Sequence, residues 1–570
     1  MKKIRSYSIL FIAAAVMTGC SGLNKMKTDA GDIRYEVTPK VLEAHGGLVN
    51  VTIKGTFPQK YFNKKATLEL TPVLTYAGGE TVFDKVQVLQ GEKVMANNKV
   101  ISYNGGDFTY TSAIPYKDAM KLSELVLRTT ASMGAKTLDF DPIKLADGVI
   151  ATSTLVGKNP APMLIKDKFQ RIIPEAQTAH IYYVINRADI RRSELAADDI
   201  KLLKEYISQV DADPDRELKG TVVSSYASPD GAYDFNEKLS EKRGASADKY
   251  IKREFRKIEA AKSDGFFESK TTAEDWEGFK TEVEKSSIQD KELILRVLSM
   301  YSDPAVRERE IKNMASAYEV LKTDVLPKLR RSKMTVNVDK IGRTDEQILA
   351  QMKSDPSVLN IEEMLYAATL TDNENEKLTF YKAAASEHPK CNRAHNNVGY
   401  ILLGMGKIDE AAASFERAKA IENNDAVKNN LGFVSLVKGE IVKAEELFNS
   451  MTAATPESRK GLGIIAITRG EYDKAVNYLG DIKCNNLALA QLLKGDVNNA
   501  KATLDALKPC PQGKHGYLKA VVGARLDDKS YMLAGLREAI SANPEWKAYA
   551  KNDVEFAKYF ADDAFKAAIQ

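Results

Sequence analysis

The stretch NNVGYILLGMGKIDEAAASFERA, residues 396–418, decides the fold of the C-terminal part of the chain. Gly399 and Gly406 stand seven residues apart, Ala411 follows five residues after the second glycine, and Phe415 follows four residues after that. A fixed period of small and large residues indicates stacked helical repeats. Two further copies hold the same register: Gly432, Gly439, Ala444 and Phe448, then Gly463, Gly470, Ala475 and Leu479.

This register resembles the tetratricopeptide repeat, in which small residues let two antiparallel helices approach closely and a large residue fills the groove beside them. Pro456 falls where that family often ends a repeat. A degenerate copy precedes at Leu365–Pro389, and a shortened copy follows around Gly495. We therefore expect about five repeats and a closing helix, which makes residues 355–570 an all-α solenoid.

The resemblance also implies a concave face, formed by the first helix of each repeat. Amides and aromatic rings on such a face suit an extended peptide or a partner's helix, so we expect a protein partner. The alternative reading is that Tyr400 and Phe433 are packing residues. The family register places these residues on the face: Arg393, Asn396, Tyr400, Leu403, Asn429, Phe433, Leu436, Lys460, Ile464 and Ile467.

Two cysteines flank the short fourth repeat, Cys484 before its first helix and Cys510 after its second. Antiparallel helices bring those two ends together, so we predict a disulfide between them in an oxidising compartment. Cys391 is more typical of a small buried residue than of a nucleophile.

The N-terminus has the pattern of a secretion signal. Lys2, Lys3 and Arg5 precede an apolar run that is shorter than a membrane-spanning helix, and Gly19 stands before Cys20. MTGC resembles a bacterial lipobox, which implies that residues 1–19 are removed and that Cys20 is acylated. The lipid would anchor the mature chain to a membrane, and residues 20–31 would form a linker. The alternative is an ordinary signal peptide with an incidental cysteine.

The residues after Cys20 bear on which side of the envelope the chain faces. Surface-exported lipoproteins of Bacteroidota resemble one another in an acidic run just after the lipidated cysteine, and this chain has no acidic residue before Asp29. We therefore expect an outer-membrane lipoprotein on the periplasmic face.

Residues 32–160 are rich in β-branched and aromatic residues, as in LVNVTIKGTF and KATLELTPVLTY, and glycine pairs punctuate them. Short strands at this spacing predict a β-sandwich. The region has no cluster of His, Cys or carboxylates of metal-ligand type, so we interpret it as a spacer or docking module.

Residues 170–342 alternate between strand and helix patterns. HIYYVINRADI and ELKGTVVSSYA predict strands, and apolar residues at helical spacing between them, from Ile200 to Val210, predict a helix. A charged and mostly helical insertion follows over about residues 255–329, and SKMTVNVDKI predicts a returning strand. The fold class is therefore multidomain α+β, with a β-α-β-α-β domain between the sandwich and the solenoid.

The loop and helix at 225–251 resemble the OmpA C-terminal domain, which associates with peptidoglycan. From Ser228, the family offsets of 3, 8 and 15 residues fall on Gly231, Asn236 and Arg243, and Leu239 and Ser240 supply the family's "LS" pair. The resemblance implies that Arg243 would grip a carboxylate of the stem peptide in a two-point fork.

The family's acid is replaced by Ser228, and Asp230 on the same loop is a candidate substitute. Loss of one charge-assisted hydrogen bond would weaken binding by about 1.5–3 kcal/mol. Wall binding and a purely structural role, in which Arg243 ties the helix to its loop, both remain open at this point.

Composition excludes little beyond nucleic acid as a partner, because 82 basic residues face 78 acidic ones. The five histidines show no metal spacing, and no nucleotide-binding glycine loop is present, so we expect neither an enzyme nor a cofactor. We expect a lipoprotein that tethers the outer membrane to peptidoglycan and recruits a protein through its repeats. The alternative is an accessory subunit of a secretion, pilus-assembly or outer-membrane assembly complex, with the OmpA-like domain binding protein.

Overall fold

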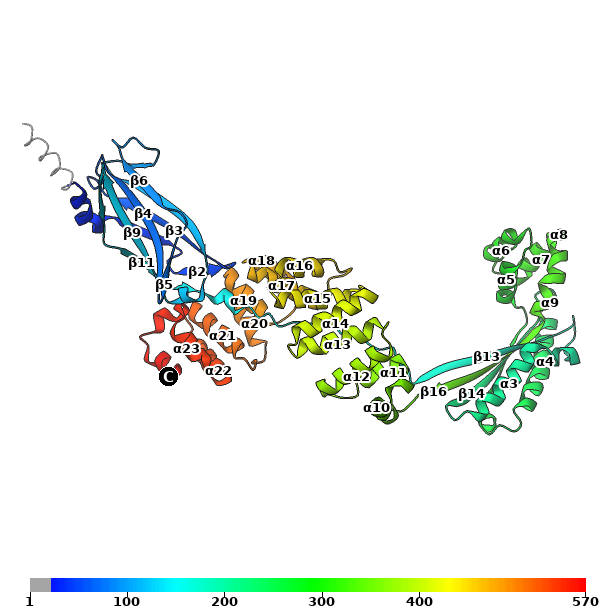
Figure 1. The fold of residues 1–570 in the computed structure, drawn as a ribbon. Helices are drawn as coiled ribbons and strands as arrows, with labels where there is room; N and C mark the ends of the chain where they lie inside the picture. The colour runs from blue at the N-terminus through cyan, green and yellow to red at the C-terminus, as the bar shows by residue number, and fades with distance from the viewer. Residues whose placement is uncertain (1–21) are drawn as a thin grey trace, which may run out of the picture. The chain divides into compact units, whose positions relative to one another are not determined.

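The computed structural model describes residues 22–570, so the expected signal peptide and Cys20 lie outside the described residues. The chain forms two compact units. Unit 1 joins the residues up to Lys166 with Asn373–Gln570, and unit 2 is Asp167–Asp372 (Figure 1). The β region and the helical array, predicted as separate domains, thus belong to one unit, and the α/β domain is inserted between them in sequence.

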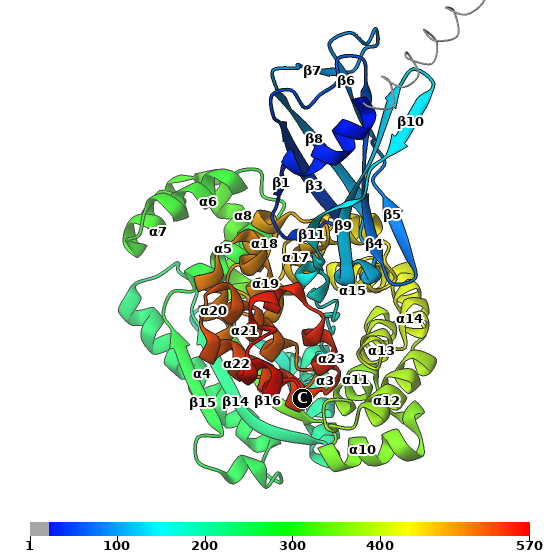
Figure 2. The same ribbon diagram turned by 90° about the vertical axis from the view of Figure 1, so that its left-hand side faces the viewer.

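The N-terminal part of unit 1 contains two β-sheets, preceded by a short helix at residues 22–28 (Figure 2). Alternate residues of β3 and β4 are buried and contribute to one shared core that includes Val51, Ile53, Leu68 and Leu70. The first sheet contains β1 (Arg34–Thr38), β2 (Leu42–His45), β3 (Leu48–Phe57), β8 (Gly106–Pro115) and β12 (Val149–Ile150). The second contains β4 (Thr67–Tyr76), β5 (Gly79–Val82), β6 (Gln87–Gly91), β7 (Lys99–Ile101), β9 (Ser123–Met133), β10 (Lys136–Asp139) and β11 (Ile143–Asp147).

The C-terminal part of unit 1 is an array of paired antiparallel helices, as predicted. A Cβ on Gly399 would lie 2.6 Å from the Phe415 ring, so the glycine is what allows the two helices of that repeat to approach. The helices are α12 (Glu374–Glu387), α13 (Asn392–Gly404), α14 (Ile408–Ile421), α15 (Asp425–Val437), α16 (Ile441–Asn449), α17 (Pro456–Thr468), α18 (Tyr472–Leu479), α19 (Asn485–Lys494), α20 (Val497–Asp505), α21 (Lys514–Arg525), α22 (Lys529–Ala542), α23 (Glu545–Lys551) and α24 (Asp563–Ala568), with a 3-10 turn η6 (Val554–Tyr559).

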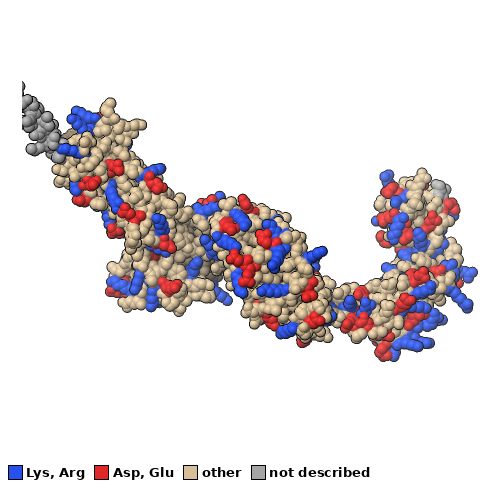
Figure 3. Space-filling model, viewed as in Figure 1, with Lys and Arg blue, Asp and Glu red and all other residues tan. Residues whose placement is uncertain are grey.

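The second glycine of each repeat, Gly406 in the first clear copy, ends the turn between the paired helices. Its φ is +76°, in the left-handed region that favours glycine, and the equivalent Gly439, Gly470 and Gly495 share this conformation. On the face shown in Figure 3, acidic and basic side chains are interspersed over the array.

Unit 2 has a four-stranded sheet in the order β13-β16-β14-β15, with α3 and α4 supplying core residues against it. The predicted β-α-β-α order is present, but the first strand begins earlier than HIYYVINRADI and ends at Tyr182. The elements are β13 (Ile172–Tyr182), α2 (Arg192–Leu195), α3 (Asp198–Ala212), β14 (Arg216–Tyr226), α4 (Tyr233–Glu254), β15 (Phe267–Thr272) and β16 (Arg331–Ile341).

The helical insertion is shorter than predicted, because residues 267–272 form β15, a mostly exposed edge strand parallel to β14. The remaining helices pack around their own core, which includes Phe279, Ile294 and Leu321. They are α5 (Trp276–Lys285), α6 (Lys291–Met300), α7 (Pro304–Asn313), α8 (Ala315–Asp324) and α9 (Leu326–Leu329).

Unit 2 ends with α10 (Asp345–Ser354) and α11 (Ile361–Ala367). The first helix of the degenerate repeat thus belongs to unit 2, and the compact array begins at Asn373 rather than at residue 355. Within residues 22–570, no helix combines the length and apolarity needed to cross a membrane.

Candidate peptide-binding groove

Asparagines recur at one position of the repeats. Asn397, Asn430 and Asn486 each stand nine residues before the second glycine of their repeat, and an asparagine precedes each of them. They lie in the first helices, α13, α15 and α19, on the side where the chain's own linker segment, residues 157–166, passes. We call the three residues the asparagine ladder.

Each ladder asparagine binds the backbone of one linker residue through both ends of its amide. The N–H of Ile165 donates to Asn397 Oδ1 at 3.0 Å, and Asn397 Nδ2 donates to the Ile165 carbonyl at 2.8 Å. Asn430 holds Met163 in the same way at 2.6 and 2.9 Å. The inner face of the array therefore holds an extended peptide that belongs to the same chain.

The third clamp lies at the N-terminal end of the linker. Asn486 accepts from the Gly157 N–H at 2.8 Å and donates to the Gly157 carbonyl at 2.7 Å. Linker numbers fall as repeat numbers rise, so the linker runs antiparallel to the order of the repeats. Because side-chain amides read only the backbone here, this part of the recognition does not depend on the linker's sequence.

The preceding asparagines form a second row of contacts. Asn396 Nδ2 donates to the Met163 carbonyl, and Asn429 Nδ2 donates to the Ala161 carbonyl, both at 3.0 Å. The two rows are also joined, because Asn430 Nδ2 donates to Asn396 Oδ1 at 2.9 Å. The predicted peptide-binding residues Asn396 and Asn429 thus contact a peptide, and that peptide is the linker.

The ladder is interrupted in the third repeat, where its position is occupied by Gly461. A Cβ there would lie 2.3 Å from the ring of Phe448, which fills the space between neighbouring repeats. No side chain at 461 can therefore donate to Asn429 as Asn430 does to Asn396. Asn429 Oδ1 is accordingly buried without a hydrogen-bond partner among the described residues.

A pocket of about 350 Å³ lies under the linker near this interruption. Lys460 and Lys514 line it, together with Gly157, Asn159, Pro160 and Ala161 of the linker. None of the described residues that line the pocket is acidic, so its wall offers neither lysine a carboxylate partner. Burial lowers the pKa of Lys514.

Cys484 and Cys510 line the same pocket, so the predicted neighbourhood of the two residues is present. Both are free thiols in the structure, and the predicted disulfide is not formed. The Cys510 sulfur instead accepts from the His515 N–H at 3.3 Å, and burial raises the pKa of Cys484.

The other residues predicted for the concave face have different surroundings. Phe433 is fully buried and packs edge-on against Phe448, as the packing alternative supposed, and Ile464 is buried beside the pocket. Tyr400 and Arg393 are partly buried on α13. The ladder residues themselves were missed, although the recurring asparagine pair in register with the glycines was a usable signal.

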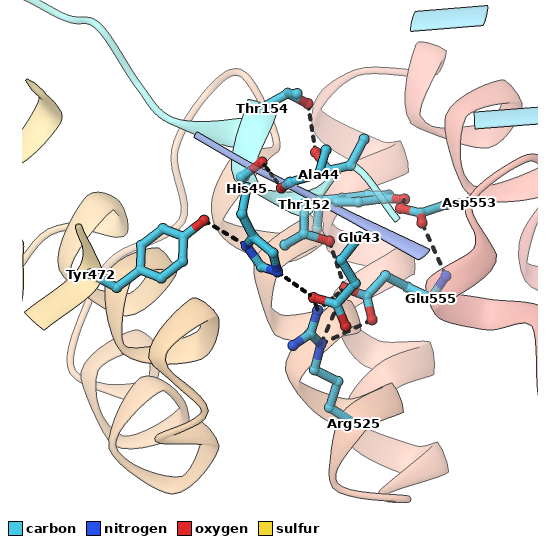
Figure 4. Close-up of polar contacts among 12 residues, drawn as sticks. Glu43, Ala44, His45, Thr152, Thr154, Tyr472, Arg525, Asp553 and Glu555 are labelled. Carbon is cyan, nitrogen blue, oxygen red and sulfur yellow. Dashed lines mark hydrogen bonds and ion pairs between the residues drawn. The ribbon is translucent and has the colours of Figure 1, made fainter. Parts of the chain in front are cut away.

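Where the linker leaves the β region, a polar cluster joins β2 to the array (Figure 4). Arg525 of α21 donates to both oxygens of Glu555 at 2.6–3.1 Å, and Glu43 lies 3.8 Å from the same guanidinium. His45 bridges Glu43 at 3.1 Å and the Tyr472 hydroxyl at 2.7 Å. The hydrogen bond with His45, aided by Arg525, lowers the pKa of Glu43 despite its burial.

The second predicted site, on the loop and helix at 228–243 of unit 2, is also assembled in space, but its groups bind one another. Arg243 is 1% exposed. Its guanidinium donates to the carbonyls of Tyr226 at 2.9 Å, Arg187 at 3.0 Å and Val184 at 3.4 Å. Burial lowers the pKa of Arg243 to about 10.

The remaining members of that site are likewise engaged. Asn236 Nδ2 donates to the carbonyls of Ser228 and Gly231 at 3.1 and 3.2 Å, and Ser228 donates to Asp230. Asp230 pairs with Arg330 at 3.3 Å, a residue that follows the helical insertion. This is the geometry expected if Arg243 ties its helix to the loop; the wall-binding role stays a prediction.

Comparisons with known proteins bear on the array. The tetratricopeptide repeat family matches residues 393–425, which confirms that part of the prediction. BBSome complex member BBS4 of Bos taurus is 25% identical over 150 residues, 26% of this chain, and this chain spans only 27% of that protein.

Two solved structures are similar to about two fifths of the chain. A tetratricopeptide repeat protein from Parabacteroides merdae matches with a TM-score of 0.30 and 16% identity, over 40% of this chain and 91% of that one. The pilF protein of Pseudomonas aeruginosa matches with a TM-score of 0.29 and 13% identity, over 39% of this chain and all of that one. The family match over residues 393–425 identifies the chain as a repeat-containing protein, and such an array suits protein partners.

Proposed function

We propose that this protein is a non-enzymatic scaffold of the bacterial cell envelope that binds a protein partner through the groove of its repeat array. The observation that supports the proposal is the asparagine ladder, because it already holds an extended peptide backbone in the groove. Groups that satisfy both the N–H and the carbonyl of alternate residues are suited to peptides and to little else.

The envelope assignment rests on the sequence. The lipobox-like residues before Cys20 support acylation there, on an outer-membrane protein that faces the periplasm. A lipid at one end would keep the array near the membrane surface, where an envelope complex would be recruited.

For unit 2 we propose a protein-binding role rather than wall binding. Its topology and motif support a resemblance to the OmpA C-terminal domain. However, the arginine that would grip a stem-peptide carboxylate is buried against three carbonyls, and Asp230 is paired with Arg330. This favours an accessory subunit of a secretion, pilus-assembly or outer-membrane assembly complex over a wall tether.

Cross-linking and capture from intact cells tests the proposal, with a tagged full-length chain. We expect one stoichiometric envelope protein to be captured, and its recovery to fall when Asn397, Asn430 and Asn486 are all changed to alanine. Asn477→Ala, at an exposed position of α18, is the matched control. Equal recovery with the triple variant would exclude the groove as the binding site.

Sedimentation with purified peptidoglycan separates the two roles of unit 2. We expect the wild-type chain to remain in the supernatant. If it sediments with the wall, and Asn236→Ala or Asp230→Ala releases it, the tethering role is correct and the protein-binding role of unit 2 is wrong.

A further inference from the structure

The linker fits its groove incompletely at one place. Between the clamped residues Gly157 and Met163 lies the sequence KNPAP, and only the Ala161 carbonyl of that stretch is held by the asparagine rows. The stretch crosses the repeat in which Gly461 interrupts the ladder.

Two amide oxygens of the groove beside this stretch, Asn429 Oδ1 and Asn485 Oδ1, are buried without a hydrogen-bond partner among the described residues. Asn429 Oδ1 is a buried acceptor, and the linker offers prolines at 160 and 162, which have no N–H to donate. An unmade hydrogen bond of this kind lowers the affinity of the groove for its occupant.

The second deficit is one of charge. Lys460 and Lys514 face the pocket beneath the linker, and the linker brings Lys158, Asn159 and no carboxylate to that place. Two partly buried ammonium groups therefore lack an anion that a different peptide could supply.

From these observations we propose that residues 157–166 are an internal ligand, which a partner's extended acidic segment displaces from the groove. The inference rests on the proposed function, since it supposes that the groove takes a partner. The ladder reads only backbone, so it accepts the incoming segment as it accepts the linker. The preferred segment has a backbone N–H near Asn429 Oδ1 and a carboxylate above Lys460 and Lys514.

Displacement must overcome the tether. A covalently attached ligand competes at an effective concentration of about millimolar, so a free peptide binds the wild-type chain much more weakly than a chain whose linker is released. The release can be engineered without touching the groove, because Asn430 and Asn397 accept from the N–H groups of Met163 and Ile165. Met163→Pro with Ile165→Pro removes both donors.

The test measures binding of fluorescent peptides to full-length chains by anisotropy. The first peptide is the linker itself, GKNPAPMLIK, and the second is GKEPAAMLIK, with an acid at the position of Asn159 and alanine in place of Pro162. We expect the proline variant to bind the first peptide about 100-fold more tightly than the wild type does, and the second about tenfold more tightly than the first. Lys460→Met with Lys514→Met in the same background should reduce this preference to the part that the added N–H at position 162 supplies.

Two outcomes would overturn the proposal. One is equal affinity of the wild-type chain and the proline variant for the first peptide, and the other is no preference for the acidic peptide. Hydrogen exchange at Gly157, whose N–H donates to Asn486, and across α13 tests whether the linker is released while the groove stays folded. The single Met163→Pro variant replaces the double one if the array is perturbed. Failure to capture an envelope partner from cells would refute the proposed function but not the displacement of the linker, because the peptide assay measures that displacement directly.

Discussion

Unit 1 and unit 2 each contain a predicted binding site whose groups are already engaged, but the occupants differ. In unit 2, Arg243 binds carbonyls at the end of β14 and in the loop after β13, which are fixed parts of the same domain. In unit 1, the asparagine ladder binds a segment without helix or strand, through backbone groups that any extended peptide has. The first arrangement is typical of a structural tie, and the second is typical of a ligand-binding groove that holds its own ligand.

The largest effect should come from Arg243→Ala, which tests the structural half of this comparison. The change leaves three carbonyls without their donor and should lower the free energy of unfolding of unit 2 by about 3 kcal/mol. Hydrogen exchange across β13, β14 and β16 measures it. Lys242→Ala, one residue away and exposed, should be neutral. A folded and equally protected Arg243→Ala chain would mean that the arginine is not a structural tie.

Gly461→Asn places an asparagine at the position where the ladder is interrupted, and it tests whether the Phe448 ring leaves room for that side chain. We expect it to destabilise the array by about 2 kcal/mol, because the new Cβ overlaps the Phe448 ring. The melting transition of the array measures it, with Gly404→Ala as the control, where a Cβ meets no atom within 4 Å. Increased stability of the asparagine variant would show that the interruption is not steric.

Asn430→Ala tests the second part of the comparison, that the asparagine ladder binds a ligand rather than holding the array together. The change removes both hydrogen bonds to Met163 and should weaken the binding of the linker by about 1 kcal/mol. Faster amide exchange at Met163 measures this effect. The helices of the array should keep their protection, in contrast to the effect of Arg243→Ala on its domain. Slower exchange at Met163, or loss of protection in α15, would contradict the expectation.

The smallest expected effect is on pH dependence, which should differ between the asparagine ladder and a titrating residue elsewhere in the array. Hydrogen bonds from the Tyr531 N–H, Ser530 and Lys501 lower the pKa of Asp528 from 3.8 to about 2. A lowered carboxyl pKa stabilises the fold above pH 3.8, and this contribution is lost as the pH falls from 3.8 to 2. Acid titration by circular dichroism should therefore be shallower in that window for Asp528→Ala. The amides of the ladder do not titrate, so acid should affect linker binding only through unfolding.

Local residue patterns were enough to predict the helix pairs of the array. The spacing of Gly399, Gly406 and Phe415 predicts the helix pair because close approach of two helices requires a small residue opposite a large one. Edge strand β15 was missed because FESKTT is mostly exposed and lacks the apolar alternation of a covered strand.

The occupants of the two sites could not be predicted in this way. The motif at 228–243 placed Asn236 and Arg243 near the loop correctly, but their carbonyl partners and Arg330 come from elsewhere in the fold. Nothing in GKNPAPMLIK indicates that it docks on helices more than 200 residues further along the chain, because a backbone-directed contact leaves no side-chain pattern in the segment that it binds.

The order of synthesis gives this contact a further consequence. Ile165 precedes Asn397 by 232 residues, and Gly157 precedes Asn486 by 329. At ~5–20 residues per second, the ribosome makes the linker on the order of ten seconds or more before its groove exists. Each repeat of the groove is therefore synthesised after the linker residue that its ladder asparagine binds.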